Sequence, residues 1–142
     1  HKRFRRRQMG ACLIRNAFTV GIADEKNLVA ADYVGIVSGH DAPDKIEKSG
    51  FHTVKSEFVD APVIEELPIS LECKVEEINQ YNATLRIVAE IVNVSVDEKI
   101  LSEDGKIDPE KLGAVSYDPA NHAYLKLGGK VGTAFSDGNQ LK

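Results

Sequence analysis

The feature that most constrains the fold is a pair of consecutive strand patterns between Ile69 and Val96. In ISLECKVE, which begins at Ile69, apolar and polar residues alternate, as they do in a half-exposed antiparallel strand. After Gln80-Tyr81-Asn82 the chain returns as ATLRIVAEIVNVSV. Because this second segment carries apolar residues on both faces, it is typical of a central strand or of one packed against a second subunit. The sequence therefore predicts a long antiparallel hairpin.

A strand and a helix are predicted near the start of the chain. AFTVGIA, residues 17–23, contains β-branched and aromatic residues and indicates a short buried strand. Asp24 can cap a following helix over residues 25–37, and Gly39 suits the left-handed residue that would end it. Gly35 lies inside this helix, where glycine lowers stability. We therefore expect a neighbouring backbone or ligand to approach Gly35 closely.

The rest of the chain alternates short helical and strand-like segments. Pro43 and Gly50 mark the first turn and the end of a second short helix. The polar segment SEDGKIDPEKLG, residues 102–113, predicts a turn and a one-turn helix beginning at Pro109. Since no internal repeat or long linker interrupts it, the sequence predicts that residues 1–142 form one domain of the α+β class, mainly β.

Composition excludes two classes of partner. The chain has 142 residues, of which 42% are hydrophobic and 28% charged, as in ordinary globular domains. No window approaches the roughly 18–20 consecutive apolar residues that span a bilayer, so we expect no membrane partner. The formal net charge of −4 and the pI near 5.6 argue against a nucleic-acid-binding protein.

The opening string HKRFRRRQMG runs against this acidic balance. A basic run can bind phosphate or RNA, but a solvated helix face is the more frequent explanation. We therefore describe residues 1–16 as an atypical basic segment, and a nucleic-acid-binding module that uses Arg3 to Arg7 stays the less favoured alternative.

The cysteines, histidines and glycines show no spacing typical of a metal, redox or phosphate-loop site. Cys12 and Cys73 form no CxxC pair, and no two histidines are four residues apart. The strings GIVSGHD and GGKVGT match neither dinucleotide-binding nor phosphate-loop spacing. Two reduced thiols suit a reducing compartment, so we expect a cytoplasmic protein. The residues by themselves predict no catalytic constellation.

The strings AFTVGIAD, VAADYVGIVSG, PDKIEKSGFHTVKSEFVDAPVIEELPISLECKV, SYDPANHAYLKLG and KVGTAFSDG together resemble the flavin reductase-like family, and are most similar to its flavoredoxin branch. The likeness covers about residues 17–142. It implies an FMN-binding split β-barrel, antiparallel and of Greek-key type, with short helices. It also implies a homodimer that binds FMN non-covalently. Such a protein passes electrons from NADH, NADPH or a protein donor through the flavin to an acceptor.

The resemblance implies three site residues in the body of the chain. Lys45, in the PDK string, would reach the flavin and stabilise its anionic reduced ring or a phosphate oxygen. Tyr117, in SYDP, would pack beside the isoalloxazine ring. Arg86 stands where related proteins carry a histidine that faces the cofactor. The alternatives are that Lys45 is a solvated helix lysine pairing with Glu47 or Asp41, and that Tyr117 is a core tyrosine.

The start of the chain departs from the family pattern. The family has a phosphate-binding segment beginning His-Lys-Thr, and here only His1 and Lys2 match it, followed by RFRRRQMGACLIR. The resemblance makes His1 and Lys2 candidate phosphate ligands and predicts a barrel that is incomplete at its N-terminal side. It also leaves an alternative function open, in which the chain is a non-catalytic split-barrel binding or interaction domain, either a flavin carrier or an apo form.

Overall fold

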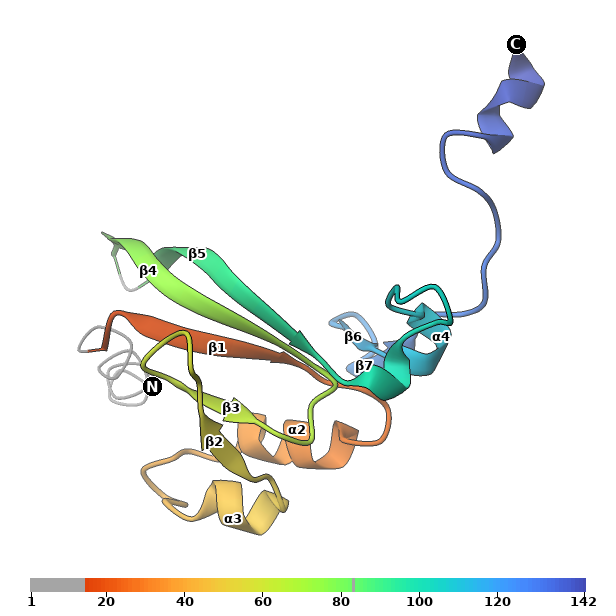
Figure 1. The fold of residues 1–142 in the computed structure, drawn as a ribbon. Helices are drawn as coiled ribbons and strands as arrows, with labels where there is room; N and C mark the ends of the chain where they lie inside the picture. Colours follow the sequence, from red (N-terminus) through yellow and green to blue (C-terminus); the bar gives the residue numbers. More distant parts are fainter. Residues whose placement is uncertain (1–14, 83) are drawn as a thin grey trace.

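The computed structural model describes residues 15–82 and 84–142 and shows a mainly β fold with short helices (Figure 1). The strands are β1 (Ala17–Ile22), β2 (Thr53–Lys55), β3 (Pro62–Ile64), β4 (Ile69–Tyr81), β5 (Thr84–Val96), β6 (Val115–Asp118) and β7 (Ala123–Lys126). The helices are α2 (Leu28–Ile36), α3 (Lys45–Ser49) and α4 (Pro109–Leu112), with 3₁₀ turns η1 (Glu98–Ile100) and η2 (Asp137–Leu141). His1, Lys2 and Cys12 lie outside the described residues.

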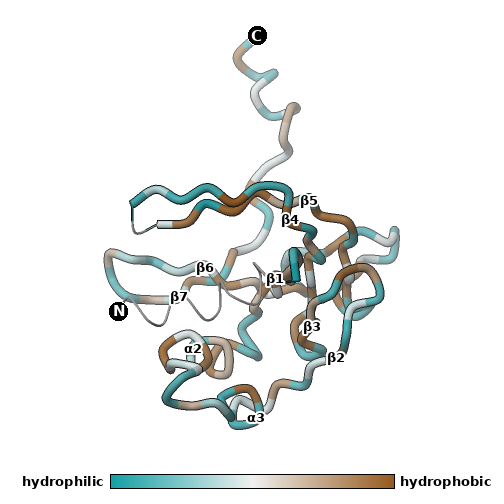
Figure 2. Tube along the Cα trace, turned by 90° about the vertical axis from the view of Figure 1, so that its left-hand side faces the viewer, coloured by the Kyte–Doolittle hydropathy of each residue, from teal (hydrophilic) through white to brown (hydrophobic). Residues whose placement is uncertain are grey.

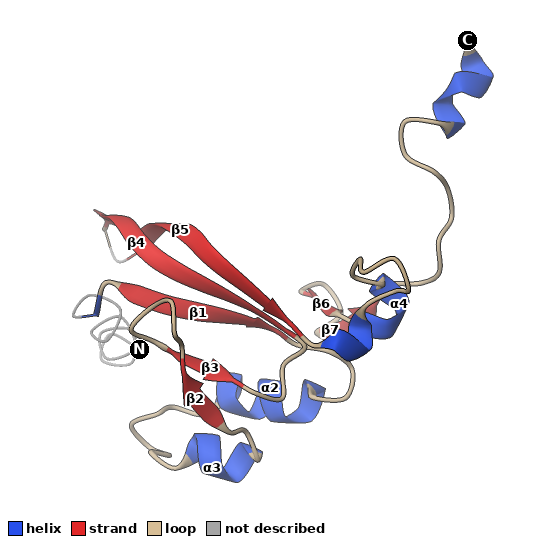
Figure 3. Cartoon of the chain, in the orientation of Figure 1, coloured by secondary structure: helices blue, strands red, loops and turns tan. Residues whose placement is uncertain are grey.

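The predicted hairpin is confirmed as β4 and β5, the two longest strands in Figure 3. Together with β1 they form a three-stranded antiparallel sheet in the order β1-β4-β5. Two separate antiparallel hairpins are added, β2-β3 by the chain between β1 and β4, and β6-β7 by the chain after β5. All strand pairings among the described residues are antiparallel, as in the predicted fold class.

Two register shifts between β4 and β5 change which side chains share a face. Glu72 pairs with Asn93, but Cys73 pairs with Ile91, so Val92 is an extra residue on β5. A bulge of this kind shifts the alternation of side chains by one residue. Val94 therefore lies on the same face as Ile91, rather than on the opposite face that regular alternation predicts. The apolar residues of β5 are thus gathered mainly on one side.

The opposite face of the sheet is polar and buried, which the sequence did not predict. Ser70 and Glu72 are each only 3% exposed, although their alternation with apolar residues indicates a solvent-facing side. The prediction of a half-exposed strand is wrong here because Ser56, from the segment after β2, lies over this face and donates a hydrogen bond to the Glu72 carboxylate. Thr19 of β1 also donates to the backbone carbonyl of Pro62 in β3. The β2-β3 hairpin therefore covers this face.

The hydrophobic core of the described residues is small, although Figure 2 shows apolar segments on several elements, β4 and β5 among them. Its buried residues are Ala17, Phe51, Ala61, Ile69, Cys73, Val75 and Ile100. The prediction of a buried first strand is largely wrong, since only Ala17 of β1 is buried and Val20 is 39% exposed. In the described residues β1 pairs with β4 alone and so forms an edge of the sheet. Burial also raises the pKa of the Cys73 thiol.

The first helix is shorter than predicted. Asp24 accepts hydrogen bonds from the backbone and side chain of Asn27, and α2 begins only after this turn. At its other end Val37 is already extended, so Gly39 does not occupy a left-handed conformation. Nothing in the described chain lies within 4 Å of a Cβ added at Gly35, so the prediction of a close backbone approach there is wrong, while a ligand contact at Gly35 stays a prediction.

The later helix ends agree with the sequence. Gly50 ends α3 with a left-handed φ of 77°, a conformation that glycine adopts without steric cost. Asp108 accepts hydrogen bonds from the first backbone N–H groups of α4, and Gly113 follows that helix with a φ of 58°. No helix in the described part of the chain is long and apolar enough to cross a membrane.

Candidate flavin site

Lys45 is the first residue of α3 and is buried, with 9% of its surface exposed. Its Nζ donates hydrogen bonds to the carbonyl of Val34 at 2.7 Å and to that of Val37 at 3.2 Å. Both carbonyls lie at the C-terminal end of α2, where the helix dipole favours a cation. The alternative of a solvated helix lysine is therefore wrong. Lys45 joins α3 to the end of α2 and places a buried positive charge between them.

Tyr117 lies on β6 and is half exposed, at 53%. Its ring centroid is 5.7 Å from that of Tyr124 on β7, with 53° between the ring planes, a tilted arrangement that aromatic pairs favour. The Tyr117 hydroxyl lies 3.1 Å from Nδ1 of His122. The alternative of a core tyrosine is therefore wrong, and Tyr117 presents much of its surface to solvent beside a second aromatic ring.

The β6-β7 hairpin is attached to the segment that begins α2. Tyr124 donates a hydrogen bond from its hydroxyl to Oδ1 of Asp32 at 2.6 Å, across 92 positions of sequence. Lys126 contacts the Glu25 carboxylate at 2.6 Å. Helix α2 thus contacts Lys45 at its C-terminal end and Tyr124 in its middle. Lys45 and Tyr124, the neighbour of Tyr117, are therefore both bound to the same helix.

Arg86 is not part of this group. It is exposed on β5 and pairs with Asn79, close to the turn that joins β4 and β5. That turn lies at the opposite end of the long hairpin from β6 and β7 (Figure 1). Within the described residues of one chain, Lys45 and Tyr117 are therefore brought near α2, whereas Arg86 is not.

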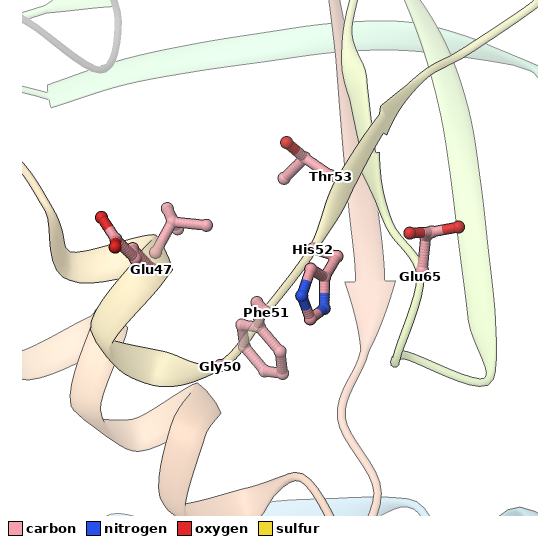
Figure 4. A pocket seen from close by; sticks show the side chains of 7 residues that line it. Glu47, Gly50, Phe51, His52, Thr53 and Glu65 are labelled. Carbon is pink, nitrogen blue, oxygen red and sulfur yellow. The ribbon is translucent and has the colours of Figure 1, made fainter.

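A shallow groove of about 450 Å³ lies between α3 and the β2-β3 hairpin (Figure 4). It is lined by Ile46, Glu47, Gly50, Phe51, His52, Thr53 and Glu65. Two of these side chains are carboxylates, which repel the phosphate of FMN. This groove therefore does not suit the flavin phosphate.

His52 and Glu66, at the edge of this groove, form a pair whose stability should depend on pH. The ring nitrogen Nδ1 of His52 lies 2.5 Å from Oε1 of Glu66. This hydrogen bond, together with the charge of Glu66, raises the pKa of His52. Burial opposes ionisation of Glu66, but hydrogen bonds from the backbone and ring of His52 outweigh it and lower the pKa of Glu66.

The two shifts predict a window of pH in which the pair stabilises the fold. The contribution of His52 is complete below its ordinary pKa and is lost as the pH rises through the raised value. That of Glu66 is complete above its ordinary pKa and is lost as the pH falls through the lowered value. We expect the difference in thermal midpoint between wild type and His52→Gln to be largest between about pH 4.5 and 6.5. A difference that stays constant up to pH 9 or so would contradict this pairing.

The roles of Asp32 and Tyr124 in the site region were not predicted from the sequence, nor was the burial of Glu72 in the sheet. Asp32 and Tyr124 meet only because two distant segments pack together. Glu72 reads as an exposed strand residue, yet it is buried. No local pattern marks such contacts. One local feature pointed to Tyr124: the strings SYDP and HAY lie close together in the sequence, so Tyr117 and Tyr124 can lie on adjacent strands of a hairpin.

The comparisons with known proteins decide the family. The sequence model of the flavin reductase like domain matches residues 5–117. This chain belongs to the flavin reductase-like family. Solved members of the family share its fold: flavoredoxin of Desulfovibrio vulgaris is 34% identical with a TM-score of 0.84, over 93% of this chain and 70% of that one. Flavoredoxin from Methanosarcina acetivorans is 29% identical with a TM-score of 0.80, over 92% of this chain and 68% of that one.

A curated relative from Halalkalibacterium halodurans, itself uncharacterised, is 31% identical over 84% of this chain. The match spans 56% of that relative, so this chain corresponds to little more than half of its length. The predictions of a flavin reductase-like protein, most similar to flavoredoxins, and of a split-barrel fold are therefore confirmed.

Proposed function

We propose that this chain binds FMN non-covalently and takes part in electron transfer from NADH, NADPH or a protein donor to an acceptor. The observation that carries the proposal is membership of the flavin reductase-like family over residues 5–117, with flavoredoxins among the structures it resembles. Bound FMN would supply the redox chemistry, by accepting a hydride or single electrons and passing them on. The protein would supply binding, orientation and charge.

The residues near α2 fit a flavin. In the proposal, the buried ammonium of Lys45 favours negative charge on the reduced ring or on a phosphate oxygen. The half-exposed ring of Tyr117 packs beside the isoalloxazine. Arg86, His1 and Lys2 are proposed as further flavin contacts, with the two N-terminal residues facing the phosphate.

We also propose that the protein acts as a homodimer in the cytoplasm. Ile91 and Val94, which share one face of β5, are 54% and 47% exposed, and a partly uncovered apolar strand face is suited to a protein interface. This is consistent with the predicted packing of β5 against a second subunit. The cytoplasm is proposed because the free thiol of Cys73 persists in a reducing compartment.

The test is flavin retention by the purified chain. We expect FMN to remain bound through size-exclusion chromatography and riboflavin, which lacks the phosphate, to bind at least about tenfold more weakly, as loss of a charge-assisted hydrogen bond implies. NADH or NADPH should then bleach the bound flavin under anaerobic conditions. A folded chain that retains neither flavin would contradict the proposal and favour the non-catalytic interaction domain.

A further inference from the structure

Helix α2 supports both residues proposed to contact the flavin in this part of the chain. Lys45 donates hydrogen bonds to the carbonyls of Val34 and Val37, at the end of the helix. One helical turn earlier, Asp32 accepts the hydroxyl hydrogen bond of Tyr124 at 2.6 Å. Since a helix moves as a rigid unit, these contacts set the positions of α3 and of the β6-β7 hairpin relative to each other.

Tyr124 connects α2 to Tyr117, because it is hydrogen-bonded to Asp32 and packs against the Tyr117 ring. Its ring packs against that of Tyr117 at 5.7 Å, so the Tyr117 ring is supported by Tyr124 on one side. The Tyr117 hydroxyl is also held by His122, which lies in the hairpin turn with a left-handed φ of 50°. Rotation of Tyr117 would disturb one or both of these contacts. The ring orientation therefore depends on Tyr124.

The contact between Asp32 and Tyr124 is charge-assisted and therefore stronger than one between neutral groups. The hydrogen bond to Asp32, with added effects of burial and of nearby charge, raises the pKa of the Tyr124 hydroxyl. The hydroxyl thus stays protonated and remains a donor over the ordinary pH range. A short hydrogen bond of this kind restricts both the hydroxyl and the ring that carries it.

We propose that Asp32 and Tyr124 are positioning residues for the flavin site, which hold the Tyr117 ring in the orientation that packs against the isoalloxazine. The inference rests on the proposed function. It adds that flavin binding depends on a contact between α2 and β7 that itself touches no flavin atom. Because Lys45 is hydrogen-bonded to the same helix, α2 supports both the proposed ring contact of Tyr117 and the proposed charge contact of Lys45.

The experiment compares FMN binding by Tyr124→Phe, Asp32→Leu and Asp32→Asn with wild type. Tyr124→Phe and Asp32→Leu each remove the hydrogen bond, so each should weaken FMN binding about fivefold, the effect of one net hydrogen bond. Asp32→Asn keeps a neutral side-chain carbonyl acceptor and should retain part of the affinity that Asp32→Leu loses. Tyr81→Phe, an exposed tyrosine at the end of β4, is the matched control and should bind FMN as wild type does.

Bound-flavin fluorescence separates positioning from general loosening of the fold. A stacked aromatic ring quenches flavin emission, so Tyr124→Phe and Asp32→Leu should increase the emission of bound FMN in the same direction as Tyr117→Leu. If wild type binds FMN and these variants change neither affinity nor emission, the positioning role is overturned and the proposed function stands. If wild type binds no FMN, both are overturned.

Discussion

Replacing Glu72 with alanine is expected to destabilise the fold by about 2–4 kcal/mol. The carboxylate is 3% exposed and accepts hydrogen bonds from Ser95 at 2.8 Å, Ser56 at 3.2 Å and Asn93 at 3.3 Å. Removing it leaves buried donors without their acceptor and opens a cavity beside them. The loss is measured by urea denaturation followed through tyrosine emission, which is well suited because the chain contains no tryptophan.

Two further variants test the cause of this loss. Glu72→Gln preserves the shape of the side chain and one acceptor, and should be destabilised by only about 1–2 kcal/mol. Glu76→Ala changes an exposed residue of the same strand and should leave the unfolding midpoint nearly unchanged. If Glu72→Ala were as stable as Glu76→Ala, the buried network would not contribute to the fold.

Replacing Lys45 with methionine is expected to destabilise the fold by about 2–3 kcal/mol and to weaken FMN binding at least about tenfold. The first effect follows from the lost hydrogen bonds to Val34 and Val37, which leave partly buried carbonyls at the end of α2 without these donors. The second follows from the lost positive charge in the proposed site. Methionine fills nearly the same volume, so the change tests the charge and its hydrogen bonds rather than packing.

Lys48→Met is the matched control for both effects. Lys48 lies on the same helix but is exposed and contacts Asp44 at 3.1 Å, and such surface pairs contribute little. Calorimetric titration with FMN and urea denaturation of both variants separate the two roles of Lys45. A Lys45→Met chain with reduced stability but wild-type FMN affinity would limit Lys45 to the support of α2 and remove it from the proposed flavin contacts.

Several strands and short helices were predicted from features that act within short stretches of sequence. Strand alternation predicted β4 and β5, and the left-handed position of Gly50 followed from the absence of a Cβ. Pro109 after Asp108 predicted α4, because these residues satisfy the first turn of a helix without help from elsewhere. The family itself was identified from strings distributed along most of the chain.

Contacts between distant segments account for the predictions that failed. Asp24 forms a β-bridge with Ala114, and the backbone N–H of Glu25 donates to the carbonyl of Gly113, so α2 starts later than its propensity indicates. The bulge at Val92 moves Val94 to the face of Ile91, and the local sequence contains no pattern that predicts a bulge there. Glu72 is buried because the β2-β3 hairpin crosses its face of the sheet.

The sequence by itself therefore determined β1, β4 and β5, the presence of α2, α3 and α4, the family and the proposal of a flavin, since each depends on local geometry or on matching strings. Only the tertiary structure decided that Lys45 is buried against α2 and that Tyr124 joins Asp32 to Tyr117. The reason is that a side chain's solvation and partners depend on which segments pack together, and 92 positions of sequence separate Asp32 from Tyr124. A lysine that reads as solvated on a short helix becomes a buried cation once the end of another helix lies against it.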